Sequence, residues 1–229
     1  MKSEYLNKIF DFFLPRVCPS CNKKLESSEE IICDYCFSKL KLTQESLIKS
    51  EFENKFATKN FIKDFHPIFV FESGNEIQHI IHSLKYNKRF RIGIFLGKII
   101  ANQLNEKLSD WKIELIIPIP LHRLKKAERG YNQSEFIAKG ISIETKIPYS
   151  RKAIHRKKFT ETQTHLSALE RQQNVKDAFK VVNKKLIEGK NILLVDDVIT
   201  TGSTITECAK VLLKEGAKNI YAASVAIAE

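Results

Sequence analysis

The stretch of sequence that decides the fold lies near the C-terminus and reads Asn191-Ile192-Leu193-Leu194-Val195-Asp196-Asp197-Val198-Ile199-Thr200-Thr201-Gly202-Ser203-Thr204. Its apolar run, from Ile192 to Val195, is typical of a buried parallel strand. After the stretch, apolar residues recur at the spacing of one helix face, at Ile205, Cys208, Ala209, Leu212 and Leu213. Gly216 then stands where a left-handed cap is expected to end a helix. The pattern predicts a strand, an acidic pair, a hydroxyl-rich loop and a helix.

The loop after the acidic pair has the chemistry of a phosphate site. Backbone N–H groups and hydroxyls at the start of a helix form a natural anion site. Two adjacent carboxylates, Asp196 and Asp197, would repel that phosphate, but they can accept hydrogen bonds from the vicinal hydroxyls of a ribose. Together these residues predict a sugar phosphate as the ligand. An ordinary strand-to-helix turn with an acidic N-cap is the alternative.

This stretch resembles the phosphoribosyl pyrophosphate (PRPP) motif of type I phosphoribosyltransferases. The resemblance implies that Asp196 and Asp197 hold the ribose and that Mg²⁺ binds with PRPP. It also implies that the 5′-phosphate is held by Thr200, Thr201, Gly202, Ser203 and Thr204. The purine-salvage enzymes of this group carry an Asp in the loop as a proton acceptor, where this chain has Thr200. Because Thr is not a general base near neutral pH, a substrate that must lose a proton is disfavoured, or another residue acts.

A second segment has the cations that a pyrophosphate group requires. It follows the next predicted strand and reads Ile117-Pro118-Ile119-Pro120-Leu121-His122-Arg123-Leu124-Lys125-Lys126-Ala127-Glu128-Arg129-Gly130-Tyr131-Asn132-Gln133. Arg123 and Arg129 are the candidate ligands for PRPP in this segment, and His122 is a weaker one. A solvated surface loop is the alternative, but its place at the end of a strand favours function.

Four cysteines predict a small metal module. They occur as Cys18-Pro19-Ser20-Cys21 and Cys33-Asp34-Tyr35-Cys36, and two such knuckles present four thiolates to one tetrahedral Zn²⁺. An iron–sulfur cluster is the other metal centre that this pattern permits, although the short knuckles favour a structural zinc ribbon. Cys208 lies on the apolar face of the predicted helix and is expected in the core.

Strands and helices alternate along the rest of the chain, which predicts an α/β fold with a mostly parallel, doubly wound sheet. Strands are expected at 68–71, 113–119, 153–154, 192–195 and 221–228, and helices at 77–84, 89–108, 133–141 and 205–213. The expected domains are an amphipathic helix with the zinc module at 1–40, a connector containing a helix at 41–64, and a phosphoribosyltransferase-like domain at 65–229.

The order of these motifs is similar to that of the ComF (ComFC) family of bacterial competence proteins. The resemblance rests on the cysteine knuckles, Leu84-Lys85-Tyr86, the Pro-x-Pro-Leu and Arg-Gly-Tyr-Asn-Gln segment, and the PRPP motif. It implies a type I phosphoribosyltransferase-like fold, a zinc finger, Lys85 as a further PRPP ligand, and a role in handling incoming single-stranded DNA during natural transformation. An active phosphoribosyltransferase of nucleotide metabolism with an unknown acceptor is the alternative function.

The charge distribution favours an anionic partner. Residues 111–190 hold 18 Lys and Arg against 8 Asp and Glu, and account for ten of the eleven excess positive charges of the chain. One cluster is the candidate surface for a single strand: Arg151, Lys152, Arg156, Lys157 and Lys158, followed by Phe159. The same segment could instead close over PRPP. A solvated, lysine-rich surface is the alternative to both.

The sequence also favours a cytoplasmic protein. No apolar run reaches the length of a membrane span, and Lys8 and Asp11 interrupt the apolar character of the N-terminus. The short amphipathic helix at 1–14 is expected to pack on the zinc module, with peripheral membrane contact as the alternative. A weaker hypothesis makes the protein an adaptor for other competence proteins, such as a DNA-translocating helicase.

Overall fold

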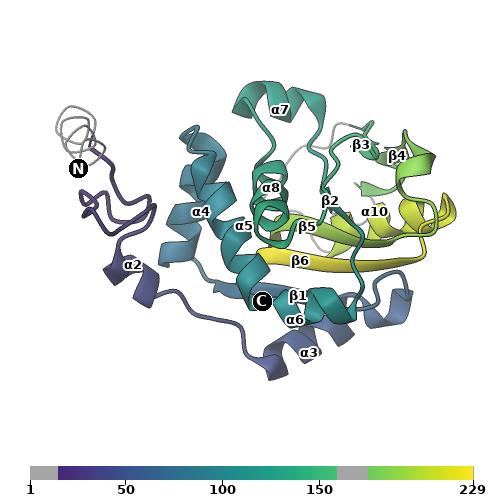
Figure 1. Cartoon of the computed structure of the whole chain (residues 1–229), viewed down its shortest axis with the longest axis horizontal. Helices are drawn as coiled ribbons and strands as arrows, with labels where there is room; N and C mark the ends of the chain where they lie inside the picture. The colour runs from purple at the N-terminus through teal and green to yellow at the C-terminus, as the bar shows by residue number, and fades with distance from the viewer. Residues whose placement is uncertain (1–14, 159–174, 229) are drawn as a thin grey trace.

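A four-stranded parallel sheet forms the centre of the computed structural model, which describes residues 15–158 and 175–228 (Figure 1). The strands lie in the order β1-β6-β5-β2, and each pairs with its neighbour in parallel register. Their bounds are β1 (Phe65–Phe71), β2 (Leu115–Pro118), β5 (Asn191–Ile199) and β6 (Asn219–Ala228). All four strands therefore end at the same edge of the sheet, which is where ligands bind in sheets of this type.

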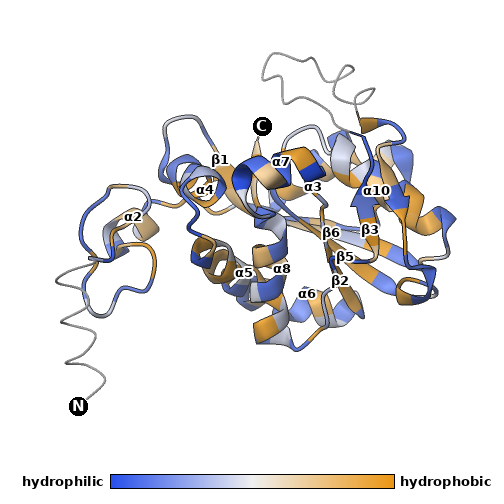
Figure 2. Ribbon diagram, turned by 90° about the horizontal axis from the view of Figure 1, so that it is seen from above, coloured by the Kyte–Doolittle hydropathy of each residue, from blue (hydrophilic) through white to orange (hydrophobic). Residues whose placement is uncertain are grey.

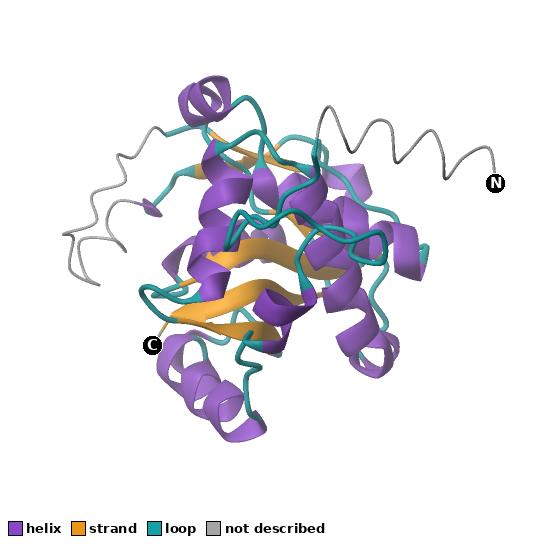
Figure 3. Cartoon of the chain, turned by 90° about the vertical axis from the view of Figure 1, so that its left-hand side faces the viewer, coloured by secondary structure: helices purple, strands orange, loops and turns teal. Residues whose placement is uncertain are grey.

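Helices cover both faces of this sheet, as Figure 3 shows. The alternation within β5 shows the two layers, because Leu193 and Val195 join one core cluster while Ile192 and Leu194 join the other. The first face carries α4 (Glu76–Tyr86), α5 (Arg91–Gln103) and α8 (Gln133–Thr145), and the second carries α3 (Glu45–Lys55) and α10 (Ser203–Lys214). This arrangement confirms the predicted doubly wound α/β fold.

Helices α5 and α8 pack unusually closely, and two glycines make this possible. A Cβ atom on Gly97 would overlap the carbonyl of Ile137, and one on Gly140 would overlap the carbonyl of Ile94. The contact fixes α8 against the sheet, so that the first residues of this helix lie at the edge where β5 and β2 end.

Shorter elements complete the described residues. They are α2 (Asp34–Ser38), α6 (Asn105–Asp110), α7 (Arg123–Arg129), the 3₁₀ turns η1 (Ala57–Lys59) and η2 (Lys184–Leu186), and an antiparallel pair, β3 (Ile154–Arg156) with β4 (Phe179–Val181). The sequence did not predict α7, because this helix buries none of its residues and so has no apolar periodicity. The ring of His122 caps its N-terminus, and the left-handed Gly130 (φ +86°) caps its C-terminus.

The predicted elements otherwise lie where the sequence placed them, with shifted ends. The helix expected at 89–108 is divided into α5 and α6, and β1 begins at Phe65 rather than Ile68. The region 41–64 contains the expected helix, and its Ile48, Phe56 and Ile62 pack in the same core cluster as β5. The exact domain boundary stays a prediction, and the amphipathic helix expected at 1–14 lies outside the described residues.

The four-cysteine module surrounds α2 and lies at one end of the molecule, as Figure 2 shows. It contacts the rest of the protein through Arg89, in the turn between α4 and α5, which donates a hydrogen bond of 2.6 Å to the carbonyl of Val17. Within the described residues, no helix combines the length and the apolar character needed to cross a membrane.

Candidate PRPP site

Two carboxylates stand near the end of β5, at the edge of the sheet. Asp196 still pairs in register with Ser224 of β6, and Asp197 is only 5% exposed. The strand places them here because the buried residues 192–195 fill both layers of the core before the chain reaches the sheet edge.

Asp196 is held by two donors. Its Oδ1 accepts hydrogen bonds from the hydroxyl of Ser134 (3.0 Å) and from the backbone N–H of Asp197 (2.9 Å). Burial and then the negative charge of Asp197 raise the pKa of Asp196 to about 7, against the weaker opposing effects of these hydrogen bonds and of Lys85. The pair therefore carries less than two full negative charges near neutral pH, and a bound cation or hydroxyl donor would favour its ionised form.

Asp197 is paired with a cation from the other side of the site. The Nζ atom of Lys85, at the end of α4, lies 2.9 Å from Asp197 Oδ2. The other carboxylate oxygen, Oδ1, accepts from the backbone N–H of Val198 (2.7 Å). The Lys85 side chain is 23% exposed, so this ion pair lies at the wall of the site rather than deep in the core.

The loop after the acidic pair forms a small pocket at the start of α10. The pocket is lined by Asp196 and by residues 198–205. Asp197 is not among its lining residues. Gly202 adopts a left-handed conformation (φ +70°), and a Cβ atom there would lie 2.7 Å from the ring of Phe56. The hydroxyls of Thr201 and Ser203 lie 2.9 Å apart, while Thr200 is exposed. The loop thus presents hydroxyls and helix N–H groups together, as a phosphate requires.

A basic cavity of about 580 Å³ lies between the end of β2, the start of α7 and β3. Five cationic side chains line it, namely Arg123, Lys126, Arg151, Arg156 and Lys157. Glu135 is the one carboxylate among the lining residues, and its two oxygens pair with Arg151 (2.9 Å) and Lys126 (3.8 Å). The excess of positive charge suits a polyanion such as pyrophosphate.

Two members of this cavity are perturbed by their surroundings. Burial, then Arg123 and other nearby cations, lower the pKa of His122, so its ring is neutral near pH 7 and accepts from the N–H of Leu124 (3.3 Å). Burial also lowers the pKa of Arg156, against opposing effects of Cys208 and Asp196. Asp196 therefore interacts electrostatically with Arg156, one of the three arginines that line this cavity.

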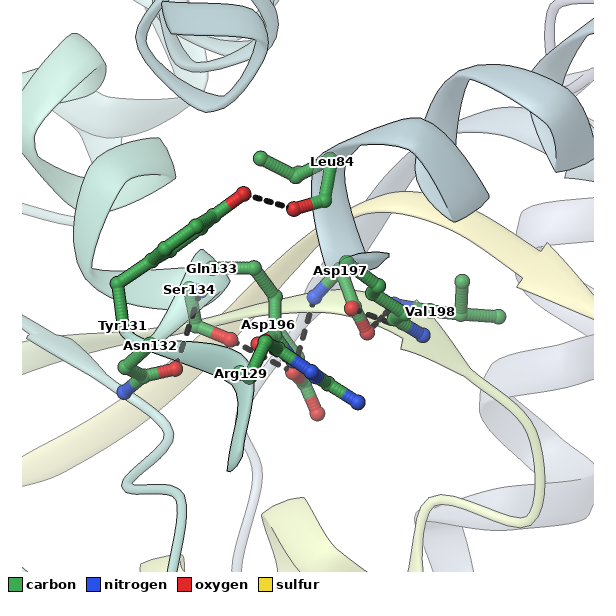
Figure 4. A network of polar contacts seen from close by, with 10 residues as sticks. Leu84, Arg129, Tyr131, Asn132, Gln133, Ser134, Asp196, Asp197 and Val198 are labelled. Atoms are coloured by element: carbon green, nitrogen blue, oxygen red, sulfur yellow. Dashed lines mark hydrogen bonds and ion pairs between the residues drawn. The ribbon is translucent and has the colours of Figure 1, made fainter. Parts of the chain in front are cut away.

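Figure 4 shows the polar network that joins α4, α7 and α8 to the acidic pair. Tyr131 donates its hydroxyl hydrogen to the carbonyl of Leu84, and Arg129 donates to Gln133 Oε1 (2.7 Å). Asn132 caps α8 by accepting from the N–H of Ser134, and donates to the carbonyl of Ile119 (2.9 Å). Residues 129–132 are therefore tied to α4, to α8 and to the end of β2 by side-chain hydrogen bonds.

The structure brings most of the predicted PRPP residues to one edge of the sheet, but separates the two arginines. Arg123 begins α7 and lines the basic cavity, whereas Arg129 ends α7 and lies over the ring of Tyr86, at 5.2 Å from its centroid. Ser134, which donates a hydrogen bond to Asp196, was not among the predicted site residues. Its only sequence signal is its place two residues after the helix-capping Asn132.

The basic segment 151–158 is also divided. Arg151, Arg156 and Lys157 line the cavity, whereas Lys152 is exposed and Lys158 Nζ donates to the carbonyl of Lys176 (3.0 Å). Phe159, the aromatic residue of this predicted DNA surface, lies outside the described residues. The structure thus places part of the segment beside the candidate PRPP site.

The four cysteines of the N-terminal module converge as the sequence predicted. The sulfur atoms of Cys18, Cys21, Cys33 and Cys36 all lie within 4.8 Å of one another, and those of Cys21 and Cys33 are 3.7 Å apart. A tetrahedral zinc site with Zn–S bonds of about 2.3 Å has S–S edges of roughly 3.8 Å. The cluster therefore fits a metal such as zinc. Cys208, in contrast, is fully buried in the core.

The sequence is similar to proteins of known family. The phosphoribosyl transferase domain family matches residues 91–228. Competence protein F of Haemophilus influenzae is 30% identical over 213 residues, which cover 89% of this chain and 87% of that protein. The chain belongs to the ComF family.

Other relatives agree with this assignment. Competence protein ComFC of Bacillus subtilis is 25% identical over 87% of this chain and 72% of its own length. DNA utilization protein YhgH of Escherichia coli is 33% identical, over 60% of this chain and 61% of that protein. Among solved structures, the allosteric regulatory enzyme of purine biosynthesis is 23% identical over 58% of this chain and 25% of its own, with a TM-score of 0.40. The match to the phosphoribosyl transferase domain family, together with the parallel sheet and the cysteine cluster, shows that this ComF-family chain has a type I phosphoribosyltransferase fold and a four-cysteine module.

Proposed function

We propose that this protein binds PRPP with Mg²⁺ at the carboxyl edge of its sheet and handles single-stranded DNA during natural transformation. One observation supports the PRPP assignment: Asp196 of the acidic pair lines the pocket of the hydroxyl-rich loop at 200–204 and accepts a hydrogen bond from Ser134, whose sequence neighbour Glu135 lines the basic cavity. A ligand that spans these three features must combine a phosphate, vicinal hydroxyls and a second polyanionic group, in that order. PRPP has this composition.

Each part of PRPP has a matching group. The 5′-phosphate would take the hydroxyls and N–H groups of residues 200–204, and the ribose hydroxyls would donate to Asp196 and Asp197. The pyrophosphate would lie toward the basic cavity, near Arg123 and Arg156. Lys85 and Arg129 border the same site from α4 and α7.

The donor set also fits Mg²⁺, a hard cation that binds carboxylate and phosphate oxygens. Asp196 and Asp197 are the residues that would hold it, and Lys85 already places a positive charge against this pair. When bound, Mg²⁺ would neutralise pyrophosphate oxygens. The chain's own residues would orient the ribose and stabilise the leaving group electrostatically.

The DNA role is supported by the relatives, two of which are named as competence proteins and one as a DNA utilization protein. In this proposal the protein contacts a single strand and acts in the cytoplasm, beside a partner such as a translocating helicase. The alternative function is transfer of the phosphoribosyl group to an acceptor of nucleotide metabolism. The exposed Thr200 gives no general base for that reaction.

Titration calorimetry with Mg²⁺ and PRPP tests the binding proposal directly. The intact protein should bind PRPP, and Asp197→Asn should bind it more weakly. Asp110→Asn is the matched control, since this exposed carboxylate ends α6 before β2 begins, away from the edge where β5 and β2 end. Absence of PRPP binding by the intact protein would refute the proposal. Pyrophosphate release across candidate acceptors would distinguish an enzyme from a binding protein.

A further inference from the structure

A cluster of aromatic rings lies beside the candidate PRPP site. Its members, here called the aromatic platform, are Tyr86, Phe90, Tyr131 and Phe136. Phe90 lies 4.9 Å from Phe136 and 6.5 Å from Tyr131, measured between ring centroids. Among the described residues, Tyr86 makes no ring contact with the other three, but Tyr131 donates its hydroxyl hydrogen to the carbonyl of Leu84, two residues before Tyr86 in α4. The guanidinium of Arg129 lies over the Tyr86 ring.

Two of these rings are exposed to a degree that core packing does not explain. Tyr86 is 58% exposed and Phe90 is 44% exposed, although both are large apolar groups. Phe136 and Tyr131 are half-buried and support Phe90 from α8 and from the turn before it. A group of large exposed rings held in place by neighbours is typical of a binding surface.

The charges around the platform define what it binds. Residues 77–105 contain Lys85, Lys88, Arg89, Arg91 and Lys98 and no Asp or Glu at all. Of these, Lys88 and Arg91 lie within two residues of Phe90 and are exposed, while Arg89 donates a hydrogen bond to Val17. A cavity of about 270 Å³ opens beside Phe90. The charged residues that line it are Arg16, Lys88, Arg89, Arg91 and one acid, Glu30. Aromatic rings among cations suit a ligand that is both flat and anionic.

We infer that the aromatic platform is the surface on which this protein binds single-stranded nucleic acid. Unpaired bases would stack on Tyr86 and Phe90, and the phosphates would contact Lys88 and Arg91. A duplex would not fit this mode, because its bases already stack on one another. The inference rests on the proposed function and replaces the segment 151–158 as the main DNA surface, since three cations of that segment line the PRPP-side cavity instead.

The platform lies next to the candidate PRPP site, so PRPP and a single strand would bind side by side. Lys85, which pairs with Asp197, is followed directly by Tyr86, and Arg129 contacts both Gln133 of the site wall and the Tyr86 ring. A strand on the platform would therefore pass the mouth of the PRPP site without entering it. Both ligands could then be bound at once.

Fluorescence anisotropy with a labelled oligothymidine tests this surface on the full-length protein. Tyr86→Ala and Phe90→Ala should each weaken binding on the order of tenfold, and the salt dependence should stay unchanged because no charge is removed. Tyr86→Phe keeps a stacking ring and should bind nearly as the parent does. Tyr35→Ala is the matched control: that ring is 65% exposed with Lys39 4.3 Å from its centroid, but it lies in the cysteine module.

The outcomes separate this inference from the function on which it rests. If the parent binds the oligonucleotide but Tyr86→Ala and Phe90→Ala bind equally well, the platform is refuted and the DNA role stands. If the parent does not bind it, both are refuted. PRPP calorimetry on Tyr86→Ala should match the parent, and thermal unfolding should confirm that each variant is folded. Loss of binding in folded Tyr35→Ala alone would move the surface to the cysteine module and overturn the proposal.

Discussion

Lys85 Nζ lies 2.9 Å from Asp197 Oδ2 and so joins the end of α4 to the end of β5, two elements far apart in the sequence. The lysine neutralises one of two adjacent carboxylates that would otherwise repel each other. A ligand hydroxyl that donates to Asp197 must share this oxygen with the lysine or displace it. The ion pair therefore holds the acidic pair in place while remaining partly open to solvent.

Removing the charge of Asp197 should weaken PRPP binding. Asp197→Asn loses one charge-assisted contact to the ribose, which is worth about 1.5–3 kcal/mol, or roughly ten- to a hundredfold in Kd. Calorimetry at saturating Mg²⁺ measures this change. Asp110→Asn removes an exposed carboxylate elsewhere and should leave the Kd within twofold. Equal affinities for all three proteins would mean that the acidic pair does not hold the ribose.

The raised pKa of Asp196, about 7, predicts a pH dependence with a definite sign. Binding of Mg²⁺ and PRPP favours the ionised carboxylate, so affinity should fall as the pH drops below 7, by up to about tenfold per pH unit. Stability should change in the opposite direction: because the folded pKa lies above the ordinary value of 3.8, the contribution of Asp196 declines as the pH rises from about 4 to about 7.

Asp196→Asn provides the control for this pH dependence. It should bind PRPP weakly at every pH, and should lack the part of the pH dependence that comes from the protein rather than from the phosphates of the ligand. A parent protein whose affinity changes with pH in the same way as that of Asp196→Asn would contradict the prediction.

The sequence predicted the parts of this site that lie in continuous segments. The strand–loop–helix around Asp196 and the cysteine knuckles follow from local patterns, and both are where they were expected. The contacts of Lys85 with Asp197 and of Ser134 with Asp196 depend on packing between α5 and α8 and on strand order, which no local pattern contains. The platform was missed because Phe90 packs against Tyr131 and Phe136, which lie more than forty residues later in the chain, and no local pattern shows that contact.

The purified protein should contain one Zn²⁺ per chain, because four sulfur atoms converge at tetrahedral spacing. Cys18→Ser or Cys36→Ser should unfold the N-terminal module, since structural zinc contributes folding free energy directly. Cys208→Ser is the matched control, because this buried cysteine lies outside the cluster and its loss should leave the zinc content unchanged. Elemental analysis that finds iron, or no metal in folded protein, would contradict the zinc assignment.

Gly202 should be the most sensitive position of the loop after the acidic pair. Gly202→Ala must hold a left-handed conformation, at a cost of about 1 kcal/mol, and must also push the ring of Phe56 away. Gly189→Ala shares the φ of +70° but has no atom within 4 Å of its Cβ position, so it isolates the backbone cost. Thermal unfolding should show a larger loss for Gly202→Ala, and PRPP affinity should fall only in that variant. Equal losses would show that Phe56 moves aside freely.

Charge reversal at Lys157 and at Lys158 distinguishes whether the basic segment 151–158 binds PRPP or DNA. Both are exposed lysines next to each other, but Lys157 lines the basic cavity and Lys158 does not. We expect Lys157→Glu to weaken PRPP binding on the order of tenfold, since it reverses a charge beside the proposed pyrophosphate position. Lys158→Glu makes the same change in net charge and should have little effect on PRPP. Oligothymidine affinity should respond about equally, and weakly, to both substitutions, because the main contacts lie on the aromatic platform. A steep loss of oligonucleotide binding with a flattened salt dependence, together with unchanged PRPP binding in both variants, would instead place the single strand on residues 151–158.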